Sequence, residues 1–401
     1  MDFGDSSEDA AFRAEVREWL TVSGKELKET LPDELYTDND IARCRAWQQK
    51  KAEAGYAHIV WPREHGGMGG TWMQAAILDQ EERRFPRPFN YFSVGIGQCL
   101  PPIMEYGTEE QKRLIARTLR GELIWCQLFS EPNAGVDLAA VRTRAEKDGD
   151  NWIVNGQKVW TSGAQVSDYG ILLARTDPDV PKHKGLTFFL VDMCSPGIEV
   201  RAIKQISGHS EFNEVFLDGL VIPDTDRLGE VNQGWSIAMQ ALTAERFKRL
   251  NTRMPSMLSL LEMSENCEVG GVKAIERDDV RQSLASCLVS KCAQENFTSR
   301  MLTVLAKGET LGSEASILKL MSCRLNQELS AYLMGLYEEN GAVIDDATHP
   351  LMQRLFDAYL WAPGLRIAGG ADEILMNIIG ERALGLPGEP RLDKGKAFKD
   401  L

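Results

Sequence analysis

The chain has 401 residues, of which 43% are hydrophobic and 26% are charged, a composition typical of globular proteins. At roughly 150 residues per domain, this length predicts two to three domains. The 45 Lys and Arg against 59 Asp and Glu leave a net charge of −14, so the chain lacks the basic field that nucleic acid or an anionic membrane requires. An anionic small molecule, which needs only a few placed cations, remains possible.

Targeting and metal-binding patterns are missing from the sequence. No apolar run approaches the roughly 20 residues that cross a bilayer, and the acidic start does not resemble a signal peptide. The eight cysteines are scattered without a CxxC pair, and the five histidines show no metal-binding spacing. We therefore expect a cytoplasmic protein with reduced thiols, no bound metal and no membrane span.

The first 120 residues follow a helical period. Ser6 with Asp9 resembles a capping box, and an apolar face follows at Phe12, Val16, Trp19 and Leu20. Further helices are predicted over 40–55, 72–84 and 108–119. The glycine-rich stretch 61–70 has no GK[ST] sequence after it and no clear strand before it. We interpret it as a loop rather than a phosphate-binding cradle.

From about 123 to 223 the pattern changes to short β-rich runs at the spacing of a sandwich or barrel. Within 151–162, the Asn155-Gly156 pair predicts a type I′ hairpin turn between two strands. Further strands are predicted over 169–175, 185–192, 198–203 and 214–221.

Helical periodicity returns at Gly234 and lasts to about Leu386. Its predicted interruptions are Gly270-Gly271, Gly308–Gly312, Asn340-Gly341 and Pro363–Gly370. Because the strands occur in one block and no GxGxxG follows a strand, a βαβ fold and a Rossmann nicotinamide enzyme are disfavoured. We predict an α+β fold in α–β–α order, with domains over 1–122, 123–233 and 234–401.

Three ordered motifs resemble those of the acyl-CoA dehydrogenase family. The stretch from Trp125 to Asp137, WCQLFSEPNAGVD, is similar to the flavin-binding T/S-E-P-x-A-G-S-D sequence, and VNGQKVWTS at 154–162 is similar to NGxKxWxT/S. Residues 367–379 and 381–387 resemble the closing motif. The resemblance implies a helical N-terminal domain, a small central β-barrel or sandwich and a C-terminal four-helix bundle.

The implied activity is FAD-dependent α,β-dehydrogenation of an acyl-CoA thioester to the trans-2-enoyl-CoA. Backbone amides and short hydroxyls suit the polar rim of an isoalloxazine, and an indole suits its face. By resemblance, Trp160 covers the ring and Ser162 donates toward the N5 edge. The full implied cofactor set is Gln127, Phe129, Ser130, Gly135, Val136, Trp160, Thr161, Ser162, Gly370, Ala371 and Glu373. The alternative for Trp160 is a core aromatic on a strand, and for the serines an ordinary turn or strand position.

Two positions in the first motif depart from the family pattern. Asn133 stands where glycine is common, and Val136 stands where serine is common. The second change removes a hydroxyl expected near the acyl-CoA. Substrate contact at Val136 would therefore come from its backbone or its shape.

The resemblance offers two positions for the base that takes the α-proton. One branch of the family places a glutamate directly before Gly-Thr in the closing motif, where this chain has Gly369. A second branch uses a Glu-Arg pair on the first helix of the C-terminal domain, which corresponds to Glu245-Arg246 here. By resemblance, Arg246 binds CoA-side polar groups or orients the glutamate. The Gly369 N–H and a flavin ribityl hydroxyl donate to the thioester carbonyl.

Helical spacing supports Glu245 independently. One helix face carries Ala238, Ala241, Leu242, Glu245 and Arg249. Desolvation beside an apolar stripe would raise the pKa of Glu245 and make it a better base. The alternative is an i,i+4 salt bridge from Glu245 to Arg249.

Two further family motifs are altered, and both concern assembly. The R-x-x-F-G stretch, which reaches a neighbour's FAD in family homotetramers, is absent from 268–281, and Q-x-x-G-G is degraded around 333–341. This resembles chains that assemble with a homologous subunit, as in steroid side-chain degrading enzymes. We expect a homotetramer, in which Arg277 or Arg281 replaces the missing arginine, or a heterotetramer. The expected electron acceptor is an electron-transfer flavoprotein.

Two other functions remain open. One is an oxygen-using acyl-CoA oxidase or monooxygenase on the same fold, which would form peroxide in air. The other is a non-catalytic partner subunit, which would purify without flavin.

Overall fold

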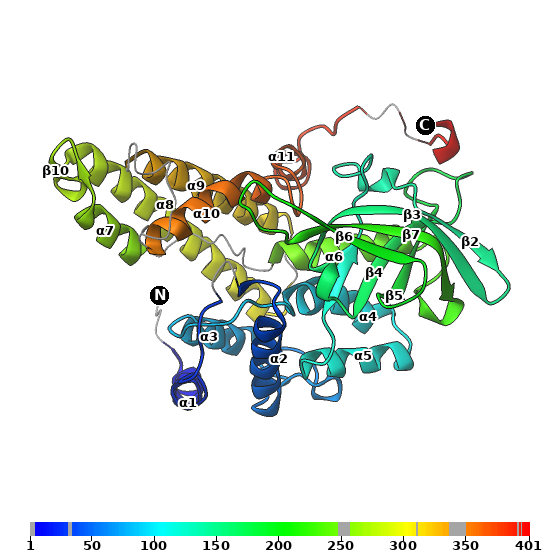
Figure 1. Ribbon diagram of the computed structural model, residues 1–401, viewed down its shortest axis with the longest axis horizontal. Helices are drawn as coiled ribbons and strands as arrows, with labels where there is room; N and C mark the ends of the chain where they lie inside the picture. The colour runs from blue at the N-terminus through cyan, green and yellow to red at the C-terminus, as the bar shows by residue number, and fades with distance from the viewer. Residues whose placement is uncertain are drawn as a thin grey trace. The chain divides into compact units, whose positions relative to one another are not determined.

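The computed structural model describes residues 5–30, 34–247, 257–309, 312–336, 350–390, 393 and 395–401, except for the side chains of 244–247, 257–259 and 350–351. Its order of elements is shown in Figure 1. The chain forms two compact units, Met1–Glu245 with Arg391–Leu401 and Arg246–Pro390.

The first unit begins with helices that carry the predicted caps. The Ser6 hydroxyl accepts the Asp9 backbone N–H at 3.1 Å, as predicted, and fixes the start of α1. Capping boxes at Thr71 and Thr108 begin α3 and α5. The glycine-rich stretch between α2 and α3 contains one 3₁₀ turn, Arg63–His65. The helices are α1 (Ser7–Ser23), α2 (Asp38–Glu53), α3 (Trp72–Glu82), α4 (Leu100–Tyr106) and α5 (Glu109–Leu119).

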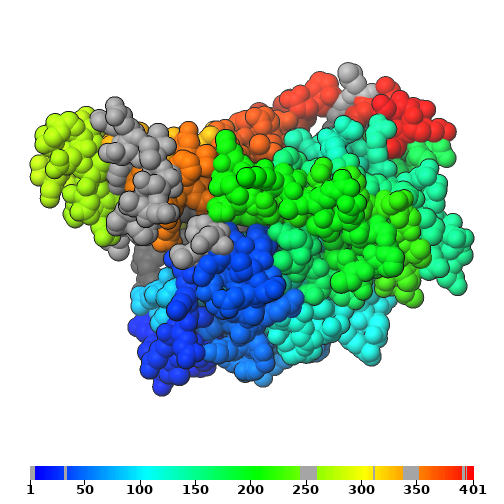
Figure 2. Space-filling view, viewed as in Figure 1, coloured from blue at the N-terminus to red at the C-terminus, as the bar shows by residue number. Residues whose placement is uncertain are grey.

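One mixed sheet follows, and it confirms the predicted block of strands. Its order is β6-β7-β3-β2-β4-β5-β8, and β1 pairs with β4 off this path. The pairs are antiparallel except β1 with β4 and β2 with β4. The strands are β1 (Trp125–Leu128), β2 (Arg144–Asp148), β3 (Asn151–Ser162), β4 (Tyr169–Arg175), β5 (Leu186–Asp192), β6 (Ile198–Ile203), β7 (Phe212–Pro223) and β8 (Arg227–Leu228). Helices and sheet form one continuous body in Figure 2 (blue to green).

The predicted hairpin turn at Asn155-Gly156 is wrong. β3 runs without interruption from Asn151 to Ser162, and the β2–β3 turn lies at 149–150, where Gly149 has a φ of 56°. Gly156 instead permits a close approach, since a Cβ there would lie 2.4 Å from the Thr143 Oγ1. Asn155 Oδ1 accepts the backbone N–H of Gly219 from the next strand at 2.8 Å.

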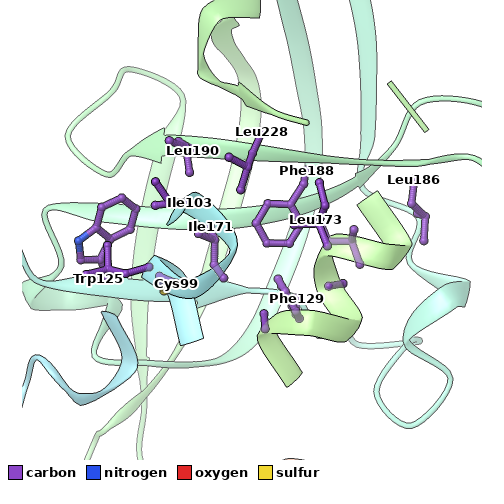
Figure 3. Packing of buried hydrophobic residues seen from close by; sticks show 14 of the residues in the cluster. Cys99, Ile103, Trp125, Phe129, Ile171, Leu173, Leu186, Phe188, Leu190 and Leu228 are labelled. Atoms are coloured by element: carbon purple, nitrogen blue, oxygen red, sulfur yellow. The ribbon is translucent and has the colours of Figure 1, made fainter. Parts of the chain in front are cut away.

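A buried hydrophobic cluster packs α4, α5 and α6 (Gly234–Phe247) against the sheet. It includes Trp125, Phe129 and Phe188, and Figure 3 shows Trp125 next to Ile103 from α4. The Trp125 indole also donates to the Thr118 hydroxyl at 2.8 Å, so its one polar atom is satisfied. From α6 the cluster receives Ile237, Ala238 and Ala241. The start of α6 therefore belongs to the core of the first unit.

The second unit is mainly helical, with one feature that the sequence pattern did not indicate. Gly270 and Gly271, with φ of 63° and 78°, form the turn of a two-stranded antiparallel hairpin where only a break in the helices was expected. Helix α9 packs against α8, α10 and α11. The predicted break at Asn340-Gly341 lies outside the described residues. The elements are α7 (Met257–Asn266), β9 (Glu268–Val269), β10 (Val272–Lys273), α8 (Asp278–Ala306), α9 (Glu314–Leu336), α10 (Pro350–Leu365) and α11 (Asp372–Ile378).

Candidate active site

The Ser-Glu-Pro stretch forms a tight turn at the end of β1. Glu131 and Ala134 exchange two backbone hydrogen bonds of 3.0 Å, which close the turn over Pro132. The Ser130 carbonyl accepts the Val159 N–H at 2.9 Å. The first motif is therefore attached directly to β3, which carries the second motif.

A buried ion pair joins the two motifs from the inside. Lys158 Nζ lies 2.8 Å from the Glu131 carboxylate, and it also donates to the Phe129 and Leu173 carbonyls. The carboxylate accepts two further N–H groups, from Arg142 and Thr143. Burial alone would raise the pKa of Glu131, but the Lys158 ammonium and these donors hold it below its usual value. Glu131 is therefore an ionised structural anchor rather than a proton acceptor.

Trp160 occupies an irregular point of β3. The pairing of β3 with β7 shifts register between Lys158 and Thr161, and at this bulge Trp160 adopts a φ of 60°. Its side chain is 58% exposed and meets Phe212 edge-to-face, with ring centroids 5.9 Å apart. Trp160 is thus a surface aromatic, and the alternative interpretation as a core aromatic is wrong.

Two of the predicted flavin-binding residues carry a buried polar atom that lacks a hydrogen-bond partner among the described residues. They are Gln127 on β1, through Nε2, and Thr161 on β3, through Oγ1. A buried polar atom without a partner is costly, and native proteins retain few of them. An amide donor and a hydroxyl beside an exposed indole fit the polar rim and flat face of a flavin. Ser162 is exposed and Ser130 is half-buried.

The remaining predicted residues of the first motif divide into core and surface positions. The Phe129 side chain lies in the core, edge-to-face with Phe188 at 5.7 Å, so the ring is not available to a ligand. Gly135 and Val136 are exposed, and Val136 retains 62% of its surface. These two residues form a solvent-exposed stretch directly after the turn at 131–134.

The second unit holds the glycine turn of the closing motif. Gly369 and Gly370 have φ of 65° and 104°, which residues with a Cβ rarely adopt. Lys319 Nζ from α9 donates to the Gly370 carbonyl at 2.6 Å, and the ammonium is almost fully buried. This bond fixes one side of the turn.

An arginine clamp fixes the other side. Arg366 and Arg324 both bind the buried Asp372 carboxylate, at 2.6 and 3.2 Å. Burial would raise the pKa of Asp372, but the two guanidinium groups keep it below its usual value. Ala371 stands at the N-cap of α11, and Glu373 is exposed in its first turn.

The predicted base, Glu245, belongs to α6, but its side chain is not among the described ones. Glu245 and Arg246 lie in the last turn of α6, and their side chains are outside the described residues. The apolar face that precedes them is confirmed, since Ala238 and Ala241 are fully buried and Leu242 is partly buried. The role of Glu245 stays a prediction, as does its alternative, a salt bridge to Arg249.

The segment that lacks R-x-x-F-G folds as β9, β10 and the start of α8. Arg277 pairs with Asp279 at 2.8 Å, and Arg281 approaches Asp278 at 4.0 Å. Both pairs are exposed to solvent. Pairs of this kind are weak, at about 0–1 kcal/mol, so either arginine can exchange its partner for a phosphate.

Neither membrane-spanning helices nor metal clusters occur among the described residues. No helix there is long and apolar enough to cross a bilayer, and no group of three or more His, Cys, Asp or Glu is placed to hold a metal. All eight cysteines lie among the described residues, and none of them forms a disulfide.

Three segments in α–β–α order, with a candidate cofactor surface on the central sheet, define the class of protein. The models for the N-terminal, middle and C-terminal domains of acyl-CoA dehydrogenases match residues 6–122, 126–220 and 232–384. The chain therefore belongs to the acyl-CoA dehydrogenase family, whose members are flavoprotein oxidoreductases.

Two curated Mycobacterium tuberculosis proteins resemble the chain. It is 34% identical to the acyl-CoA dehydrogenase IpdE1 over 385 residues, which is 95% of this chain and 98% of IpdE1. It is 39% identical to the acyl-CoA dehydrogenase FadE34 over 346 residues, which is 84% of this chain. The match spans only 45% of FadE34, so the chain corresponds to about half of that relative.

Two solved structures share the fold over 97% of this chain and 100% of theirs. One is the ChsE4-ChsE5 complex from M. tuberculosis, with a TM-score of 0.80 and 27% identity. The other is the Tcur3481-Tcur3483 steroid acyl-CoA dehydrogenase, with a TM-score of 0.78 and 26% identity.

Proposed function

We propose that the chain catalyses FAD-dependent α,β-dehydrogenation of an acyl-CoA thioester. The observation that carries this proposal is Trp160, an exposed aromatic held at a strained backbone position within the second family motif. Gln127 Nε2 and Thr161 Oγ1 support it as buried polar atoms that have no hydrogen-bond partner in the described part of the chain. When bound, FAD would accept the β-hydrogen of the substrate as a hydride.

In this proposal the chain's own residues orient the cofactor and move one proton. Trp160 covers one face of the ring, and Gln127, Thr161 and Ser162 donate to its rim. Glu245 takes the α-proton, the α and β C–H bonds break, and the C=C bond forms between the two carbons. The Gly369 N–H polarises the thioester carbonyl while negative charge develops on its oxygen.

The proposed substrate carries a bulky acyl group of the steroid class. The support is the likeness to a steroid acyl-CoA dehydrogenase and the altered assembly motifs of this chain. Electron-transfer flavoprotein is the proposed acceptor. The cytoplasmic location expected from the acidic start and the scattered cysteines stays a prediction.

The test is anaerobic bleaching of the flavin absorbance by acyl-CoAs of different bulk, in the wild type and in Glu245→Gln. The variant keeps the shape of the side chain but loses its basicity. We expect substrate binding to persist and flavin reduction to slow by at least about 10²-fold, the lower end for a positioned base. Reduction at the wild-type rate would show that another group takes the proton.

The same preparation separates the other two functions. Peroxide formation in air without an added acceptor would indicate an oxygen-using enzyme. A flavin-free chain that stays colourless after FAD is added would indicate a non-catalytic subunit.

A further inference from the structure

The C-terminal tail, defined here as residues 393 and 395–401, packs on the loop 176–184 between β4 and β5. Phe398 N donates to the Val180 carbonyl at 2.9 Å, and Lys399 N donates to the Pro178 carbonyl at 3.0 Å. In Figures 1 and 2 the red end of the chain lies beside the loops at the end of the sheet. Backbone pairing thus gives the tail a fixed register on the loop.

Arg175 links the tail to the segment that follows the first motif. Arg175 is 3% exposed, and its guanidinium donates to the Ala139 carbonyl at 2.6 Å and to the Val141 carbonyl at 3.3 Å. The Phe398 ring covers the same guanidinium, with the ring centroid 3.6 Å from Cζ. Without this ring, the cation that holds the segment 137–141 would face water.

Lys182 makes a second link of the same kind. Its ammonium lies 2.7 Å from Asp137, the last residue of the first motif, and 2.6 Å from Asp393 in the tail. Arg175 and Lys182 therefore each contact both the tail and the segment 137–141. Val136, the predicted substrate contact, directly precedes this doubly held segment.

We propose that the tail is a clasp that positions the loop 134–141 for ligand binding. A loop held in its binding conformation loses less conformational entropy when the ligand arrives, which raises affinity without adding a contact. The ligand is the acyl-CoA of the proposed function, and this half of the inference rests on that function. The contacts of the clasp do not depend on it.

Hydrogen exchange tests the clasp directly. The Ala140 and Val141 amides donate to carbonyls within the loop, to Asp137 at 2.9 Å and to Leu138 at 3.3 Å. In the full-length chain, Phe398→Ala and Asp393→Asn should each speed exchange of these amides at least threefold. Exchange in β4 and β5 should stay unchanged. Unaltered loop exchange in both variants would overturn the clasp.

Lys399→Ala is the matched control. It lies in the same tail, but its ion pair with Asp179 is exposed and does not touch Arg175 or Lys182. Loop exchange should match the wild type. Equal loosening in this variant would show general fraying of the tail and would contradict the specific clasp.

Acyl-CoA binding tests the consequence. We expect Phe398→Ala to weaken acyl-CoA binding by three- to tenfold, with flavin reduction at saturation within twofold of wild type. Phe398→Tyr, which keeps a ring over Arg175, should restore affinity. A loosened loop with unchanged affinity would overturn the positioning role. If the wild type binds no acyl-CoA, the proposed function fails, and the exchange experiment still decides the clasp.

Discussion

Trp160 combines two unfavourable features at the scale of a single residue. Its left-handed backbone costs about 1–2 kcal/mol for an L-residue, and its indole is largely exposed instead of packed. Strained residues of this kind cluster at functional sites, where the surrounding structure enforces them. The β3–β7 bulge supplies that enforcement here.

Trp160→Gly separates stability from cofactor binding. Glycine accepts a φ of 60° without strain, which offsets the lost contact with Phe212. We expect the melting temperature of the apoprotein to change by less than about 2 °C, which corresponds to roughly 1–2 kcal/mol for a chain of this length. FAD affinity should fall at least tenfold in fluorescence titration. An unchanged affinity and flavin spectrum would contradict the placement of the ring at Trp160.

At the scale of elements, the Glu131–Lys158 pair connects the turn after β1 to β3. The partners are 27 residues apart and have 8% and 0% of their side chains exposed. A buried pair adds little stability compared with apolar residues, but the loss of one partner leaves a buried charge uncompensated. The pair therefore holds the turn at 131–134 against β3.

Lys158→Met should destabilise the chain by about 3–5 kcal/mol in urea unfolding. Adding Glu131→Gln should recover part of this loss, because the buried carboxylate is then removed. Lys147→Met is the control, since its pair with Asp224 on the same sheet is partly exposed and the expected loss is at most about 1 kcal/mol. Equal losses at the two lysines would contradict the anchoring role of Lys158.

At the scale of the whole molecule, the open question is what neutralises the pyrophosphate of FAD. The sequence lacks R-x-x-F-G, and the two arginines in the substituted stretch, Arg277 and Arg281, lie in exposed pairs. We therefore propose an oligomer in which a homologous partner completes each FAD site.

Light scattering with flavin absorbance tests this assembly. Expressed alone, the chain should hold less than one FAD per chain. Coexpression with a homologous subunit that carries R-x-x-F-G should give one FAD per pair of unlike chains. A homotetramer with one FAD per chain and full turnover would exclude an obligate partner. Arg277→Ala and Arg281→Ala would then identify the cation.

The sequence by itself determined the order of helices and strands and the family. The helix cap at Ser6, the 3.6-residue period and the short apolar run in 169–175 are local signals that short windows contain. The motifs around Ser130, Trp160 and Gly369 identified the candidate site by resemblance.

Only the tertiary structure revealed the contacts between segments that lie far apart in the sequence. Asn155-Gly156 has the composition of a turn, but Thr143 and Gly219 hold it within a continuous strand. The pairing of Glu131 with Lys158 and the cover of Phe398 on Arg175 join residues 27 and 223 positions apart. No local period encodes such contacts. They form only in the folded chain, where the turn after β1 packs on β3 and the C-terminal tail packs on the end of β4.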